Sequence, residues 1–486
     1  MSRFFPALAL FLALLMALPP WPASAEMTME DERQMGDEAL AEVLAQLPLV
    51  HDPDTVDYVN HLGGKLAEEI PDKPFPFHFY VANDPTVNAF ALPGGNIFFY
   101  RGLITTVDSE AELAGVMAHE MGHVWRRHIA KRMDKSKPIS YAAMAGMLAG
   151  MLLGALAGVP ALGSALTMGS LGAGLQTMLA YSRQDEEEAD WAAYNTMAKA
   201  GYPPKAMVQS FRRIWNLERQ MGSDSVPVYL RTHPTSPQRM EHMENMLRQN
   251  PVKVQPFDNS DFLRIKTRLI ALYESEEEAQ NFFARERKTH PSDPMPLYGL
   301  ALLAMRQDNY ATALGYLDSL AKQWPNNPQV LREMGRCYLL RGDFNQAQNV
   351  LGKVLLLNPR DRQALLYLGQ AYLREGHLEP ARHALGRVVE LDPDYPEAQH
   401  DLGVTLGRLG REGEASYHLG LAFKLIGKER PARFHLKRAM DDPKLDKKIK
   451  DKAARAMDDM IQAEAHKKPT PEPTPEPTPE PTGRRW

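Results

Sequence analysis

Apolar residues recur at spacings of three and four through residues 26–75, most clearly in LAEVLAQL and VDYVNHLGGKLAEEI. That spacing places apolar side chains on one face of a helix, so this region is predicted to be helical. The period then changes, because 77–83, 87–92 and 97–102 are rich in aromatic and β-branched residues and PGGN at 93–96 is a turn signal. The pattern predicts three strands in a small antiparallel sheet.

Helices are predicted again beyond the sheet. Ser109 is followed three residues later by Glu112, which forms a capping box and starts a helix expected to run through about Met133. Charged residues at 183–190 open another helix, which should end near Gly201 because Tyr-Pro-Pro follows. The chain is therefore expected to be mainly α.

An internal repeat begins beyond residue 258. Small residues recur every 34 positions, at Ala301, Gly335, Gly369 and Gly403, and a leucine follows each after sixteen positions, at Leu317, Leu351, Leu385 and Leu419. This period, with small residues where two helices would cross, resembles the tetratricopeptide repeat. The resemblance implies an all-α solenoid over 258–430, with a groove that suits an extended peptide or a partner's helix. A C-terminal helical cap is expected at 431–466.

Both ends of the chain are expected to lie outside the folded domains. Arg3, an apolar run at 4–18 and the sequence Ala-Ser-Ala ending at Ala25 have the pattern of a signal peptide, so cleavage after Ala25 and export are predicted. The tail at 467–486 repeats Pro-Thr-Glu and should be extended. The single cysteine, Cys337, allows no internal disulfide, which fits a bacterial periplasm.

The amino-acid composition bears on whether the protein binds nucleic acid. The chain is 44% hydrophobic and 24% charged, and its net charge is −5. These values are ordinary for a globular protein and show no basic excess. Nucleic-acid binding is therefore set aside.

The strongest sign of chemistry is HEMGH at 119–123, inside the capped helix. His119 and His123 lie four residues apart and therefore on one helical face, where both imidazoles can bind one zinc ion. Glu120 lies beside them, where its carboxylate can take a proton from an attacking water. The motif predicts a metal-dependent hydrolase with one zinc per chain.

The third ligand must come from elsewhere. His128 is one position short of the histidine in HExxHxxGxxH and would be turned well over 90° from the ligand face of a continuous helix, so it is interpreted as a surface or supporting residue. The acidic run at 183–190 offers the alternative. Within that run, Glu186 and Asp190 are four apart, so one can bind metal while the other hydrogen-bonds a ligand.

These motifs together resemble the zinc metallopeptidase family that includes the CAAX prenyl protease and the heat-shock protease HtpX. The resemblance rests on HEMGH, a glycine-rich stretch, YSRxxExEAD at 181–190, and THP at 232–234 followed by an arginine. It implies a zincin-like α+β domain with His119, His123 and Glu186 as zinc ligands and Glu120 as the general base. By the same resemblance Asp190 donates a proton or orients, His233 is a fourth ligand or oxyanion stabiliser, and Arg239 supports substrate or oxyanion.

The glycine-rich stretch at 138–182 separates the two parts of the expected zinc site. It contains no charged residue and no histidine, and glycine stands at every fourth position of 146–158. Because His123 precedes it and Glu186 follows it, the stretch must turn back on itself beside the metal. We expect a helical hairpin or lid. A hairpin that dips into a membrane, making peripheral contact through 139–181, and two spans broken at Pro160 stay open as alternatives.

The expected organisation is a signal peptide at 1–25, a zinc metallopeptidase domain at 26–257, the repeats, the cap and the tail. Family members with this combination imply a periplasmic endopeptidase, peripheral to the outer membrane in one reading, that degrades misfolded or stalled outer-membrane proteins. Its repeats would bind the outer-membrane β-barrel assembly machinery or its clients. Unfolded substrates would pair with the exposed edge of the strand at 97–101. The alternative is a chaperone or scaffold that acts through the repeats while the protease is latched shut.

Overall fold

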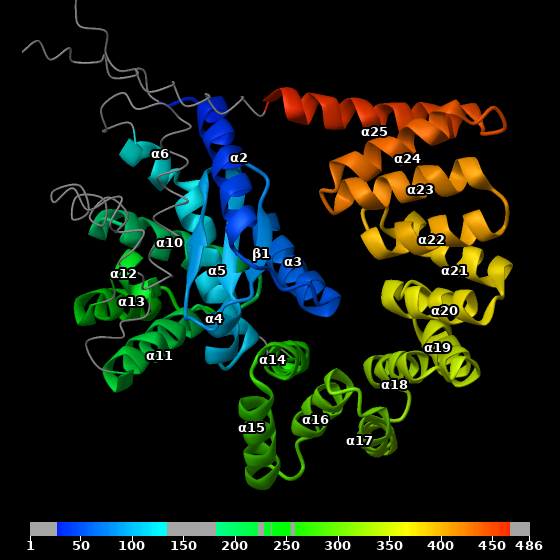
Figure 1. Ribbon diagram of the computed structural model, residues 1–486. Coiled ribbons are helices and arrows are strands. Elements are labelled where there is room, and N and C mark those ends of the chain that lie inside the picture. Colours follow the sequence, from blue (N-terminus) through cyan, green and yellow to red (C-terminus); the bar gives the residue numbers. More distant parts are fainter. Residues whose placement is uncertain (1–26, 134–180, 222–227, 235, 254–257, 467–486) are drawn as a thin grey trace, which may run out of the picture. The chain divides into compact units, whose positions relative to one another are not determined.

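The computed structural model describes residues 27–133, 181–221, 228–234, 236–253 and 258–466 (Figure 1). The chain divides into two compact units, Met1–Gly299 and Leu300–Trp486. The expected lid at 138–182 falls almost wholly outside the described residues, as do the expected signal peptide and the Pro-Thr-Glu tail. Among the described residues, no helix is both long enough and apolar enough to cross a membrane.

The first unit contains a three-stranded sheet surrounded by helices. The sheet consists of β1 (His78–Ala82), β2 (Ala89–Ala91) and β3 (Asn96–Tyr100), with the 3-10 turn η1 (Pro93–Gly95) between the last two. Its helices are α2 (Met29–Gln46), α3 (Pro53–Glu68), α4 (Arg101–Thr106), α5 (Glu110–Trp125), α6 (His128–Met133), α10 (Arg183–Lys199), α11 (Lys205–Met221), α12 (Val228–Thr232), α13 (Pro237–Gln249), α14 (Ser260–Tyr273) and α15 (Glu276–Thr289). The mainly α class with a small sheet is confirmed.

The strand pairing corrects two expectations from the sequence. The order is β1-β3-β2, with β3 parallel to β1 and antiparallel to β2, so the sheet is mixed and not wholly antiparallel. β3 is therefore the central strand, paired on both sides, and all its residues are buried. The prediction that this strand offers an exposed edge to substrate is wrong, because both of its edges are already hydrogen-bonded. The edge strands are β1 and β2.

The two faces of the sheet bury alternate side chains, as the twofold repeat of a strand requires. One face packs into a core shared with α3 and α5 through Phe79, Val81, Ala89, Ala91, Ile97 and Phe99. The other face is covered by α2, which lies across it in Figure 1, through Phe90, Phe98 and Tyr100. The sheet is thus held between helices, and α5 is fixed in the middle of the larger core.

The helix that carries HEMGH ends earlier than the sequence suggests. Ser109 caps α5 by accepting from the Glu112 backbone N–H at 3.2 Å, which confirms the predicted start. α5 stops at Trp125, and Arg127 takes a left-handed conformation with φ of 54° before α6 begins at His128. A single continuous helix to Met133 is therefore wrong. The break turns the chain, so His128 does not lie where an uninterrupted helix would put it.

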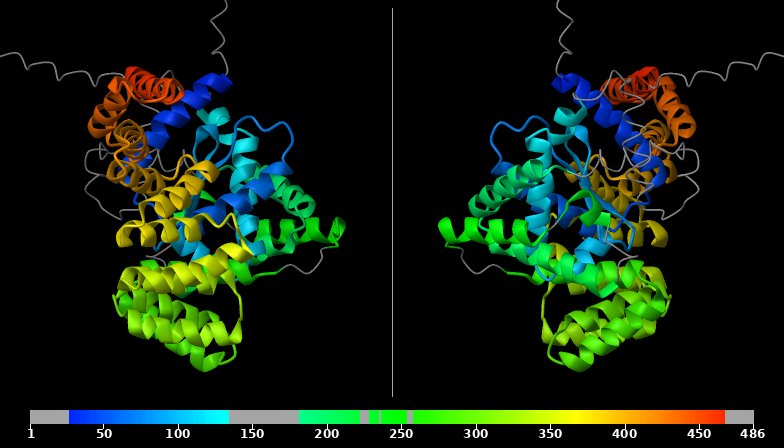
Figure 2. Two further views of the ribbon diagram at one scale, coloured as in Figure 1. Left: turned by 90° about the vertical axis from the view of Figure 1, so that its right-hand side faces the viewer. Right: turned by 90° about the vertical axis from the view of Figure 1, so that its left-hand side faces the viewer.

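The second unit is built of antiparallel helix pairs that stack in sequence order (Figure 2). It consists of the end of α16 (Met295–Arg306), then α17 (Tyr310–Gln323), α18 (Pro328–Arg341), α19 (Phe344–Leu357), α20 (Arg362–Glu375), α21 (Leu378–Leu391), α22 (Pro396–Arg408), α23 (Glu412–Leu425), α24 (Glu429–Asp441) and α25 (Lys447–His466). A Cβ on Gly335 would lie 2.5 Å from Leu351, and one on Gly369 would lie 2.6 Å from Leu385. The small and large residues of the repeat therefore meet where paired helices cross, as predicted.

Candidate metal centre

The central part of the candidate site is the buried end of α5. His119, Glu120 and His123 are each at most 1% exposed. α10 can approach this helix closely because Gly122 has no side chain: a Cβ there would lie 3.1 Å from the Cα of Ala189. The close packing brings the acidic start of α10 against the two histidines.

α10 begins with a capping box in which Ser182 and Asp185 satisfy each other's backbone N–H groups. This cap sets the first helical turn, and Glu186 and Asp190 follow one turn apart on the face toward α5. His233 lies directly after α12, and Arg239 lies in the first turn of α13. The structure therefore brings together all seven residues that the sequence identified: His119, Glu120, His123, Glu186, Asp190, His233 and Arg239.

Four of these side chains form a cluster that could hold a metal ion, His119, His123, Glu186 and His233. The Nε2 atoms of His119 and His123 are 3.1 Å apart. Glu186 Oε1 lies 3.6 Å from His123 Nε2 and 3.0 Å from His233 Nδ1, and His233 Nδ1 lies 3.4 Å from His119 Nε2. Donors around one tetrahedral zinc are about 3.4 Å apart, given bonds of about 2.1 Å. These four distances lie close to that value, and all four donor atoms lie within 4.8 Å of one another.

Asp190 and Arg239 support this cluster from behind. Asp190 Oδ1 lies 3.0 Å from His119 Nδ1, the nitrogen that faces away from the other donors. Arg239 donates from Nε and Nη2 to the two oxygens of Asp190, each at 2.8 Å, and its Nη1 pairs with Glu186. The guanidinium also lies over the Phe211 ring at 4.8 Å. One buried arginine therefore orients both acids of the ExxxD pair.

Charges within the cluster decide the protonation of its acids. Burial alone would raise the pKa of Glu186, but the charges of Arg239 and His233 outweigh it and hold that pKa well below its usual range. The pKa of Asp190 is lowered in the same way, with burial opposed by Arg239. Both acids are therefore carboxylates, the form that binds a cation and accepts from an imidazole N–H.

The histidines are affected in opposite directions. Burial tends to lower the pKa of His119, but hydrogen bonds to Asp190 and Glu186 prevail and raise it to about 9. Burial and the neighbouring His119 charge lower the pKa of His123 well below its usual value. A neutral His123 has a free ring nitrogen, which is the form that ligates a metal.

Glu120 differs from the other acids of the site. Among the described residues neither of its carboxylate oxygens has a hydrogen-bond partner, although the side chain is fully buried. The His233 Nε2 atom is 3.5 Å from Oε1. A buried carboxylate without a hydrogen bond is costly unless it serves a function. Its place beside the donor cluster suits a group that takes and returns a proton.

Several residues around the cluster were missed or misread from the sequence. His128 is 1% exposed, and its Nδ1 lies 2.9 Å from His123 Nδ1, so the surface interpretation is wrong and the supporting one holds. No pattern signals this contact, because the break at Arg127 creates it. Tyr181 stacks on His123 with ring centroids 3.7 Å apart, and Tyr229 stacks on His233 at 4.6 Å. Tyr181 is the first residue of the YSR motif, and this motif was the sequence feature that could have identified Tyr181 as a site residue.

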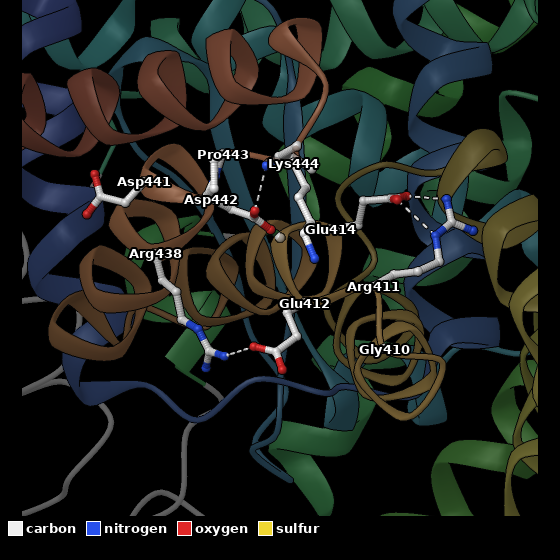
Figure 3. Close-up of a pocket in the computed structure, with 11 residues that line it drawn as sticks. Gly410, Arg411, Glu412, Glu414, Arg438, Asp441, Asp442, Pro443 and Lys444 are labelled. Atoms are coloured by element: carbon white, nitrogen blue, oxygen red, sulfur yellow. Dashed lines mark hydrogen bonds and ion pairs between the residues drawn. The ribbon is translucent and has the colours of Figure 1, made fainter.

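A concave feature lies in the repeat unit, between the start of α23 and the end of α24 (Figure 3). It is an open hollow of about 660 Å³ lined by Arg411, Glu412, Arg438 and Asp442 among others. Its charges satisfy one another: Arg411 donates to Glu414 at 2.6 Å, and Arg438 pairs with Glu412. No metal-binding set of side chains lies there within the described part of the chain.

Comparison with known proteins agrees with both units. Residues 55–247 match the model of peptidase family M48, and residues 277–328, 304–365 and 339–402 match tetratricopeptide-repeat models. A metallopeptidase domain followed by such repeats is therefore the class of protein that the fold and site define. The donor cluster can serve as the metal centre of that class.

Curated relatives share this combination over most of the chain. The chain is 32% identical over 349 residues to a putative beta-barrel assembly-enhancing protease of Vibrio cholerae serotype O1, which covers 67% of this chain and 70% of that protein. It is 31% identical over 330 residues to the beta-barrel assembly-enhancing protease of Escherichia coli strain K12, covering 65% and 64%. The chain thus belongs to the beta-barrel assembly-enhancing proteases of peptidase family M48.

The chain spans 62% of the length of the related beta-barrel assembly-enhancing protease of Yersinia pestis. Among solved structures, MamA residues 41 to the end from Desulfovibrio magneticus RS-1 aligns with 25% identity and a TM-score of 0.31, covering 36% of this chain and 98% of that one.

Proposed function

We propose that this protein is a periplasmic zinc endopeptidase that degrades misfolded or stalled outer-membrane proteins. The observation that carries the proposal is the four-donor cluster of His119, His123, Glu186 and His233, with spacings of 3.0 to 3.6 Å. Three nitrogens and one carboxylate oxygen are a donor set typical of zinc. The signal-like sequence at 1–25 supports export, and the names of the relatives support a role in outer-membrane assembly.

Each residue has a proposed role in peptide hydrolysis. Zinc, when bound, supplies Lewis-acid polarisation of the peptide carbonyl and acidifies the attacking water. Glu120 takes the proton from the attacking water and passes it to the leaving amine, since its carboxylate lies beside the donors and has no hydrogen bond among the described residues. Asp190 orients His119 through its Nδ1–H, and Arg239 fixes Asp190 and Glu186. Asp190 therefore has the orienting role rather than the proton-donating one.

The proposed position of the substrate follows from the strand order. A protease that accepts unfolded chains needs a free strand edge for main-chain hydrogen bonds. The outer edge of β1 is occupied at its C-terminal end, since Val50 N–H donates to Val81 O and Asn83 N–H donates to Pro48 O, both at 2.8 Å. β2 forms the opposite edge and contacts α5, which carries His119. We therefore assign β2, in place of β3, as the strand that aligns the peptide.

His233 supports the second function considered, a scaffold with a latched protease. Its Nδ1 lies within 3.4 Å of two other donors, which is where a fourth ligand belongs. His119, His123, Glu186 and His233 together would hold a bound zinc ion with four donors and would leave no place for an attacking water. The repeats then do the main work until a substrate or partner draws His233 away. In this account the latch regulates the protease and does not replace it.

The test of the proposed activity is the Glu120→Gln variant. Amide for carboxylate keeps the shape but removes the proton acceptor, so hydrolysis of an unfolded outer-membrane protein should fall about 100-fold or more. Zinc content, measured on the same samples, should not change because Glu120 is outside the donor set. Unchanged cleavage with normal zinc content would show that Glu120 is not the base.

A further inference from the structure

His128 and Glu188 are used by none of the steps above, yet they form a chain of contacts that ends on His123. His123 Nδ1 lies 2.9 Å from His128 Nδ1, and His128 Nε2 lies 3.3 Å from Glu188 Oε2. His128 is 1% exposed, so its ring nitrogens cannot turn to water instead. From these contacts we propose that His128, itself oriented by Glu188, is a positioning residue that holds His123 in the tautomer that ligates the metal.

The positions of the protons on His128 and His123 follow from the contact with Glu188. Glu188 is an acceptor only, so His128 must carry its proton on Nε2 and donate it to Oε2. A neutral His128 then has a lone pair on Nδ1, which can accept only if His123 carries its proton on Nδ1. That leaves the lone pair of His123 on Nε2. This is the atom that lies 3.1 Å from His119 Nε2 and 3.6 Å from Glu186 Oε1, among the proposed ligand atoms.

Neighbouring groups leave Glu188 as the acceptor for His128. Asp185 Oδ1 is farther from His128 Nε2, at 3.9 Å, and Asp185 is engaged by Arg132 and by the Ser182 cap, both at 2.7 Å. Glu188 accepts from Gln184 through its other oxygen, Oε1, at 2.9 Å. Its Oε2 therefore remains for His128.

The other histidine of the HEMGH motif, His119, also has a carboxylate that orients its ring. Asp190 lies 3.0 Å from His119 Nδ1 and orients that ring directly. His123 has no carboxylate at hydrogen-bond distance from its Nδ1 among the described residues, and His128 relays one from α10 instead. Such partners typically change metal affinity 10–100-fold when they are removed. The relay also connects α6 to α10, the two described segments that flank 134–180.

The test measures zinc affinity by competition with a chromogenic chelator, using the full chain. Glu188→Gln should weaken zinc binding about tenfold, and His128→Leu should weaken it by at least as much. His128→Asn should recover part of the loss, because its Oδ1 can still accept from His123. The matched control is Glu187→Gln, one residue away on the exposed side of α10, which should bind like the wild type.

A double variant separates a relay from two independent effects. Because Glu188 acts only through His128, adding Glu188→Gln to His128→Leu should weaken binding no further. The visible absorption bands of the cobalt-loaded protein should shift in both single variants, since the geometry at His123 changes. Thermal unfolding of the metal-free variants checks that they fold. Should His128→Leu not fold, Glu188→Gln alone decides, because its carboxylate is partly exposed.

The inference rests on the proposed zinc site, and the outcomes distinguish the two. Wild-type protein that binds no zinc would overturn the proposed function and the relay with it. Wild-type protein that binds zinc, together with Glu188→Gln and His128→Leu variants that bind equally tightly, would overturn the relay alone. Additive losses in the double variant would also overturn it, because they would show that Glu188 acts by another route.

Discussion

At the scale of single residues, the site combines charges that would each be costly alone. Glu186 and Asp190 are buried carboxylates, and both remain ionised because Arg239 lies between them. Glu120 is the exception, since its carboxylate has no such partner. Glu186 and Asp190 are therefore fixed in place, whereas Glu120 is the acid that we propose to move a proton. His233 is the remaining donor, and its removal tests the latch.

Replacing His233 by alanine should increase proteolysis. A latch closed in about nine molecules of ten leaves a tenth of them competent, so removing it should raise the rate of peptide hydrolysis about tenfold. The measurement is the initial rate of cleavage of an unfolded substrate at saturating zinc. A rate that falls instead would show that His233 stabilises the oxyanion rather than blocking the site.

At the scale of elements, regular patterns were predictable and interruptions were not. The strands, the start of α5 and the capping of α10 follow from local sequence, and so do the helix crossings marked by Gly335 and Gly369. The position of His128 did not follow, because one left-handed residue, Arg127, redirects the chain. The strand order also escaped prediction, since pairing of β1 with β3 skips the intervening strand.

In the candidate metal site, too, local patterns were predictable and tertiary contacts were not. The spacing in HEMGH predicted that His119 and His123 bind one metal, because a helix turns local spacing into a shared face. The spacing of Glu186 and Asp190 left open which of the two binds metal, and the family resemblance assigned Glu186. His233 and Arg239 were identified only through resemblance to a family, because spacing alone does not relate a residue between helices to a distant metal. Tyr181 and His128 contact His123 through tertiary packing that no local pattern encodes.

The repeat helices contain a group that should make their stability depend on pH. Burial, aided by the charges of Lys452 and Arg411, lowers the pKa of His418 to about 4. His418 in α23 also lies 2.7 Å from Gln399 Oε1 through its Nδ1. The unfolded chain therefore binds a proton near pH 6.5 that the folded state resists, so stability is lost as pH falls from about 6.5 towards 4.

Urea unfolding of the full chain at pH 7.5 and at pH 4.5 should detect this loss. The transition of the repeats should be less stable at the lower pH, by up to about 3 kcal/mol from His418. His418→Gln keeps a hydrogen-bonding side chain that does not titrate, and it should flatten this part of the dependence. An equal loss of stability in the wild type and in His418→Gln would show that other groups cause the pH dependence.

At the scale of the whole molecule, α14 joins the start of the helical repeats to the peptidase core. Arg268 on α14 is 1% exposed and donates to Asp52, the cap of α3, at 2.9 and 2.5 Å. It also donates to the Tyr298 hydroxyl of α16 at 2.7 Å. Arg101 pairs with Glu274 nearby. All of these contacts lie within the first unit, so α14 packs as part of the unit that contains the peptidase core.

Removing the central cation of this network should destabilise the first unit. Arg268→Ala leaves Asp52 and Asp54 buried without their shared partner, which typically costs about 3–5 kcal/mol. The expected result is a lower urea midpoint for the first unit. Arg285→Ala, at a position 69% exposed on α15, is the matched control and should change stability by less than about 0.5 kcal/mol. Equal midpoints would show that the network is not structural.

The central claim is that two helices separated by a long segment share one zinc ion. Metal analysis of purified Glu186→Ala protein, beside wild type and Glu187→Ala, tests it most directly. The wild type and Glu187→Ala should each carry about one zinc per chain, whereas Glu186→Ala should lose most of it because a donor of the cluster is gone. Full zinc occupancy in Glu186→Ala would contradict the account.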